Sequence, residues 1–360
     1  MRISGLVVLR LAATILVSGA AASAGAQDAP EDLTTLPPVH SEFVPQRTPW
    51  GDPDLRGTWP IQRFSEADIS FQRAEAAGER VWQTDEEFAA RVAKAEQDDA
   101  GVGFEASLGG GSIGLADWVR THRDGRRTSM IVEPANGRLP ALTPSGEALF
   151  KAGRSSWVNA QAIDGLIDLD TFDRCITRGL PSIMVPTMGN NAVRIFQAPG
   201  LVVLKMETLE TRLIPIATGG HPPPAVRTWM GDSRGRWEGN TLVIETANII
   251  DGDGTGRAPV RLAASPAYLE GPYPVGPRAH LVERLTMIGP DEIVYEATYT
   301  DPDVFTAPWS IRLTWPRDDG YRMFEYACHE GNTQVRNMIN SSRAQRRLDA
   351  AAESPETGAR

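Results

Sequence analysis

The stretch Thr228–Asn248, TWMGDSRGRWEGNTLVIETAN, is the most informative part of this chain about its fold. A run of turn-forming residues, GDSRGRWEGN, is followed directly by the apolar run TLVIET. Glycine beside Asn or Asp is typical of the tight turns that join antiparallel strands. The stretch therefore predicts a β-hairpin, with Trp229 and Trp237 on either side of its turns.

Apolar runs of the same kind fill the second half of the chain. From about Ala192 onward they follow one another between turns rich in Gly, Pro and Asp: VRIFQ, LVVLKM, LETRLIPI, TLVIET, HLVERLTM, EIVYEATYT, WSIRLTW and YRMFEYAC. Several alternate between apolar and polar residues, as strands with one buried face do. The run predicts a mainly β fold, either an antiparallel calycin-like barrel or, as the alternative, a β-sandwich.

Helices are predicted before and after the strands. A T-x-x-E capping box at Thr84 and Glu87 predicts a helix over residues 84–98. Thr143 and Pro144 predict the start of a short second helix. A C-terminal helix is predicted over 332–352, capped by Asn332, and the glycine-dense stretch 101–114 predicts a mobile loop.

The first 26 residues have the pattern of a secretory signal peptide. Arg2 supplies a positive start, residues 6–20 are mostly apolar, and an A-x-A cleavage pattern ends at Ala26. The apolar run is short for a membrane span and contains Arg10. We therefore expect a periplasmic or secreted protein without an integral membrane segment after cleavage.

The remaining sequence predicts a single domain. Residues 27–49 predict an extended lead-in, 50–352 one β-rich domain with a helical N-terminal part, and 353–360 a disordered tail. The formal net charge of −10 argues against nucleic acid as a partner, and the sequence leaves the oligomeric state open.

Cys175 and Cys328 are the only cysteines. An even count in an exported protein predicts a disulfide, with two buried free thiols as the alternative.

Several segments resemble a widespread family of exported bacterial proteins without an assigned activity. The segments are GDPDLRGTW, RTSMIVEPANGRLPALTP, RCITRGLP, GDSRGRWEGNTLVIET and EYACHEGN, and the resemblance spans roughly residues 50–340. It implies that both cysteines lie within family motifs, which favours the disulfide. Two G-x-W triplets, ending at Trp59 and Trp237, are similar to the strand that opens lipocalin and calycin barrels.

The sequence contains no common metal motif and no cofactor motif in the structural context that the motif requires. The five histidines are scattered, and H-E-x-x-H, H-x-H and C-x-x-C are absent. The P-loop is absent as well. The spacing G-x-S-x-G occurs at residues 110–114 and 231–235, and G-x-G-x-x-G at residues 109–114, but none of them lies between a predicted strand and a predicted helix, as a nucleophile elbow or a dinucleotide-binding fingerprint requires. We therefore expect no metal and no cofactor.

Charged residues on apolar strand faces are the candidates for catalysis. Glu283 shares a predicted strand face with Leu281 and Leu285, where burial would raise the pKa of its carboxyl group. The alternative is an ion pair with an arginine from a neighbouring strand. Arg212 and Glu210 share a face in the same way and form either a charged pocket floor or a solvated strand edge.

A second group of candidates lies near turns. His329 and Glu330 follow the last predicted strand, where His329 could act as a general acid or base or could simply satisfy the helix start. Asp232 and Arg234 could bind an anionic or hydroxyl-rich group or could brace each other. The predicted pocket walls are Trp229, Trp237 and Tyr299.

Two functions fit these patterns. The first is a cofactor-independent lyase, isomerase or hydrolase that uses His329, Glu283 and Arg212 on a small, partly apolar or aromatic substrate. The alternative is a lipocalin-like protein that binds a small hydrophobic ligand without catalysis.

Overall fold

The computed structural model describes residues 29–61, 69–94, 126–152, 162–186, 191–216, 219–252 and 264–353. The predicted signal peptide, the glycine-dense stretch and residues 354–360 lie outside these ranges. Among the described helices, none is both long and apolar enough to cross a membrane.

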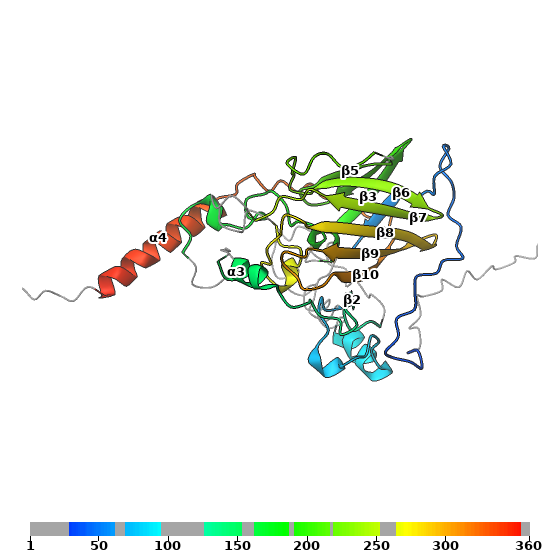
Figure 1. The fold of residues 1–360 in the computed structure, drawn as a ribbon, viewed down its shortest axis with the longest axis horizontal. Coiled ribbons are helices and arrows are strands. Elements are labelled where there is room, and N and C mark those ends of the chain that lie inside the picture. The colour runs from blue at the N-terminus through cyan, green and yellow to red at the C-terminus, as the bar shows by residue number, and fades with distance from the viewer. Residues whose placement is uncertain are drawn as a thin grey trace, which may run out of the picture.

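The smaller of two antiparallel sheets has four strands, in the order β1-β3-β4-β5 (Figure 1). Their bounds are Gly57–Pro60 for β1, Ala192–Ala198 for β3, Leu201–Met206 for β4 and Thr211–Pro215 for β5. Because short turns join β3 to β4 and β4 to β5, these three strands form a meander.

The larger sheet has six strands, in the order β2-β10-β9-β8-β7-β6. Their bounds are Ile131–Glu133 for β2, Asp232–Glu238 for β6, Thr241–Ala247 for β7, His280–Gly289 for β8, Glu292–Thr300 for β9 and Trp309–Pro316 for β10. Strands β6 and β7 are the predicted hairpin, since Glu238 pairs with Thr241 across a turn in which Gly239 has φ 62°. The hairpin prediction is confirmed, but the run GDSRGRWEGN that the sequence assigned to turns is mostly strand β6, and the turn is confined to its end.

One hydrophobic core takes side chains from both sheets. Trp59 and Ile195 enter it from the small sheet, and Leu285 enters it from the large one. The predicted alternation on β9 and β10 is confirmed, because every second residue of each strand is buried: Ile293, Tyr295, Ala297, Tyr299, Trp309, Ile311, Leu313 and Trp315. The two sheets thus give a mainly β, sandwich-like fold.

The closed calycin-like barrel that the sequence favoured is not formed by the described strands, which make two separate sheets. The sheets meet at β5 and β6 through a single parallel bridge between Ile216 and Gly235. On the other side, the Asp318 amide donates one hydrogen bond to the Thr58 carbonyl, at 2.9 Å. Alternating burial did not distinguish the alternatives, because a barrel and a sandwich both bury every second residue.

Two predicted helix starts are confirmed. The Thr84 amide donates to the Glu87 carboxylate at 3.0 Å and the Glu87 amide to the Thr84 hydroxyl at 3.2 Å, and the helix that begins at Asp85 is described as far as Lys94. Helix α3 covers Pro144–Ala152. The Thr143 hydroxyl caps α3 by accepting a hydrogen bond from the Gly146 amide, at 2.9 Å.

The C-terminal part differs from the prediction in two details. Helix α4 covers Gln334–Glu353 and extends away from the sheets (Figure 1), but the Asn332 side chain donates to the Asp173 carbonyl, at 3.1 Å, and does not cap it. The predicted strand at 321–328 is absent. The Phe324 amide donates to the Glu207 carboxylate, at 2.7 Å, so a side chain takes the place of a neighbouring strand.

Candidate functional site

Two predicted catalytic residues form an ion pair inside the core. Arg212 on β5 and Glu283 on β8 meet between the sheets, with Nη1 2.8 Å from Oε1, and their side chains are 2 % and 0 % exposed. The Tyr295 hydroxyl also donates to Glu283, at 2.8 Å. This is the ion pair that the sequence left open as the alternative, and a substrate could reach it only if the core opened.

The predicted aromatic pocket walls lie in three different surroundings. Tyr299 is fully buried, and its hydroxyl donates to Asp301 at 3.3 Å. Trp237 is partly buried against the core, and Trp229 lies under the guanidinium group of Arg174, 5.9 Å from it. Because Tyr299 belongs to the core, it cannot line an open pocket.

Asp232 and Arg234, which the sequence assigned to tight turns, lie on strand β6 and brace each other. Asp232 accepts hydrogen bonds from Arg234, at 2.7 Å, and from the His221 ring, also at 2.7 Å. Burial acts to raise the pKa of Asp232, but the bonds from Arg234 and His221 outweigh it and lower that pKa. The sequence did not indicate His221, whose ring is brought to Asp232 by the chain between β5 and β6.

His329 and Glu330 are exposed in the turn that precedes α4. Neither of them lines the groove described below, although Cys328 and Gly331 on either side do. The structure therefore does not bring His329 into the core, where Glu283 lies.

The predicted disulfide is present. Cys175 and Cys328 are bonded, with Cα atoms 5.7 Å apart and a sequence separation of 153 residues. The bond holds the RCITRGLP segment against the EYACHEGN segment, next to the start of α4.

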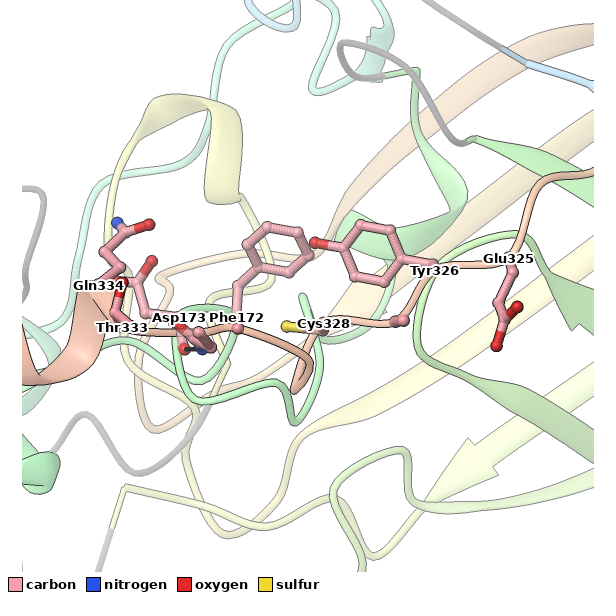
Figure 2. Close-up of a pocket in the computed structure, with 10 residues that line it drawn as sticks. Phe172, Asp173, Glu325, Tyr326, Cys328, Thr333 and Gln334 are labelled. Carbon is pink, nitrogen blue, oxygen red and sulfur yellow. Dashed lines mark hydrogen bonds between the residues drawn. The ribbon is translucent and has the colours of Figure 1, made fainter. Parts of the chain in front are cut away.

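A groove of about 430 Å³ lies beside this disulfide. Figure 2 shows the rings of Phe172 and Tyr326 next to each other along it, with Asp173 toward one end and Glu325 toward the other. The two ring centroids are 6.1 Å apart, in a stacked arrangement. The complete lining is Phe172, Asp173, Glu325, Tyr326, Ala327, Cys328, Gly331, Asn332, Thr333 and Gln334.

Arg178 joins the groove wall to a second layer of side chains. Its guanidinium group lies 4.1 Å from the centre of the Phe172 ring and 5.8 Å from that of Tyr268. Burial lowers the pKa of Arg178, while the charges of Tyr268, Tyr326 and Glu210 act in the opposite direction. A guanidinium stacked in this way fixes the orientation of both rings.

Glu210 is the buried carboxylate of this layer. It lies in the turn between β4 and β5 and is 7 % exposed. Burial raises its pKa, and the nearby Thr177 hydroxyl and the charge of Arg178 offset this only in part. Burial also raises the pKa of Tyr326, and the charge of Glu210 adds to that increase, so Glu210 lies within electrostatic range of the groove wall.

The sequence indicated only part of this site. It left Glu210 as part of either a pocket floor or a solvated strand edge and placed both cysteines in motifs, but it did not point to Phe172, Arg178 or Tyr326. The available signal was the disulfide itself, since a bond between RCITRGLP and EYACHEGN brings the aromatic and charged residues of both segments together.

The described residues include no group of three or more His, Cys, Asp or Glu side chains that could hold a metal ion. No protein-family model, curated protein or solved structure matches this chain.

Proposed function

We propose that this protein is an exported binding protein that holds a small, partly aromatic molecule in the groove beside the Cys175–Cys328 disulfide. The observation that carries the proposal is the stacked pair of Phe172 and Tyr326 in a groove of about 430 Å³. Pockets for small ligands have volumes of roughly 300–1,000 Å³ and are rich in aromatic walls with a few polar groups.

The disulfide supports this proposal because it fixes both groove walls. Phe172 and Tyr326 lie three and two residues from the bonded cysteines. A wall that is already held in place loses little conformational entropy when a ligand binds. The bond also supports export, because disulfides persist mainly in oxidising compartments.

Binding is favoured over catalysis by the positions of the predicted catalytic residues. Glu283 and Arg212 neutralise each other in the core, and His329 is exposed outside the groove lining. A general acid and a general base must both come within about 3 Å of the reacting atoms, directly or through one water. Binding needs only the walls of the groove.

Native mass spectrometry of protein purified from the periplasm, followed by calorimetric titration with benzyl alcohol and benzamidine, tests the proposal. We expect a bound small molecule or a saturable titration, and Phe172→Ala should weaken binding about tenfold through the loss of one stacking ring. Phe196→Ala is the matched control, because Phe196 lies on β3, is 50 % exposed and does not line the groove.

The proposal is contradicted if the purified protein carries no small molecule and neither probe binds. It is also contradicted if Phe172→Ala and Phe196→Ala weaken binding equally, because the groove would then not be the site.

A further inference from the structure

We propose that Glu210 is the charged contact of this site and that the ligand is a small aromatic cation with N–H donors, such as an amidinium or a protonated amine. This inference rests on the proposed binding function and adds the chemical class of the ligand.

The carboxylate of Glu210 is buried without a well-formed hydrogen bond. Both of its oxygens are inaccessible, and no described residue lies in hydrogen-bond geometry with either of them. The Thr177 hydroxyl and the Arg178 amide lie close enough to lower the pKa of Glu210, but that hydroxyl is directed at the Met230 sulfur, 3.1 Å away. A buried carboxylate in this state is costly, and native proteins retain such groups mainly where function uses them.

Glu207 is a buried carboxylate of the same turn that does have hydrogen-bond partners. Both lie at the β4–β5 turn, three residues apart, and Glu207 is 2 % exposed. Glu207 accepts hydrogen bonds from the Phe324 amide, at 2.7 Å, and from the Tyr321 hydroxyl, at 3.0 Å. The same hairpin therefore satisfies one buried carboxylate and leaves the other available to a donor from outside.

Tyr326 gives a ligand a route to Glu210. It lies in the segment before α4 that has no regular secondary structure. Its ring stacks on Phe172, with the two centroids 6.1 Å apart. A small rotation of this side chain would uncover the layer that contains Arg178 and Glu210, with the ligand ring replacing the Tyr326 ring against Phe172.

The charge of the groove selects a cation. Asp173 and Glu325 are among its lining residues, whereas that lining contains no Lys or Arg. Arg178 stacks behind Phe172 and offsets part of the charge of Glu210. An N–H donor that carries a positive charge would form the strongest hydrogen bonds with the unsatisfied carboxylate.

Calorimetric titration with three flat probes of similar size tests this inference: benzamidine as the cation, benzyl alcohol as the neutral molecule and benzoate as the anion. The wild-type protein should bind benzamidine most tightly. Glu210→Gln should weaken the binding of benzamidine by about tenfold or more and should change the affinity for benzyl alcohol by less than about twofold. Glu210→Asp should keep the preference for the cation.

Glu325→Gln is the matched control for general electrostatic attraction. This variant removes a carboxylate at one end of the groove. It should weaken the binding of benzamidine by only about twofold to threefold, because an exposed charge contributes little to affinity. Circular dichroism of each variant verifies the fold.

The possible outcomes separate this inference from the proposed function. If Glu210→Gln and the wild type bind benzamidine with equal affinity, Glu210 has no role in binding and the groove remains the site. If the wild type binds benzoate more tightly than benzamidine, the same conclusion holds. If no probe binds the wild type and no ligand is purified with it, the binding function fails and the role of Glu210 fails with it.

Discussion

Arg212 and Glu283 connect the two sheets through a buried ion pair, one partner on β5 and the other on β8. The hydroxyl groups of Ser233 and Thr246 lie 3.1 and 3.3 Å from the same guanidinium, and Tyr295 donates to the carboxylate. This polar centre within the sandwich is satisfied almost entirely by its own members. Its stability therefore depends on both charges being present.

The ion pair predicts that Glu283→Gln destabilises the fold by about 3–5 kcal/mol, because the charge of Arg212 would remain buried without its partner. Urea unfolding measures this loss. Glu296→Gln is the control. The ion pair of Glu296 with Arg312 is partly exposed, so its loss should lower the free energy of unfolding by about 1 kcal/mol or less. A Glu283→Gln protein with unchanged stability would show that the pair is not structural.

The disulfide predicts a loss of both stability and binding when Cys175 and Cys328 are replaced by serine. The bond closes a loop of 153 residues, which corresponds to about 4–5 kcal/mol if the chain entropy of the unfolded state dominates. Phe172 and Tyr326 would lose their fixed spacing as well. Calorimetric titration and urea unfolding of the double variant test both effects, and wild-type affinity in the variant would contradict the second.

The buried carboxylate predicts that Glu210→Gln stabilises the protein near neutral pH. The folded-state pKa of Glu210 is raised by burial, so folding disfavours its ionised form. The penalty is absent below the unfolded-state pKa and grows as the pH rises through the raised folded-state pKa. The variant should therefore have the higher Tm at about pH 7.5 and the same Tm as wild type at about pH 3.5.

Glu207→Gln is the control for this measurement. It alters a carboxylate that accepts hydrogen bonds from Phe324 and Tyr321, so it should lower the Tm at neutral pH. If both variants lower the Tm, the carboxylate of Glu210 is satisfied in solution.

The junction of the sheets predicts that Gly235→Ala is destabilising by about 1–3 kcal/mol. A Cβ atom at this position would lie 2.6 Å from Ile216 Cδ1 and 2.9 Å from Ile214 Cγ2, so β5 would have to move away from β6. Gly239→Ala in the adjacent turn is the comparison. A Cβ atom at Gly239 would meet open space, but the residue has φ 62°, so this variant measures backbone strain alone, without a packing clash. Thermal unfolding compares the two, and an unchanged Tm for Gly235→Ala would show that the junction opens freely.

The sequence by itself determined the local structure of this protein. The hairpin at β6 and β7, the alternation on β9 and β10 and the helix starts at Thr84 and Thr143 were all predicted, because each depends on residues within one turn or one strand. The disulfide was predicted as well, because the chain has only two cysteines.

Only the tertiary structure decided how the strands close and which polar groups meet. Alternation put Glu283 on an apolar strand face and left Arg212 and Glu210 as either a pocket floor or a solvated edge. It could not say that Glu283 and Arg212 neutralise each other while Glu210 is buried without a well-formed hydrogen bond. These differences depend on contacts between residues far apart in the chain. A strand pattern carries no information about its partner across the core, and that is why the groove wall formed by Phe172 and Tyr326 emerged only from the folded chain.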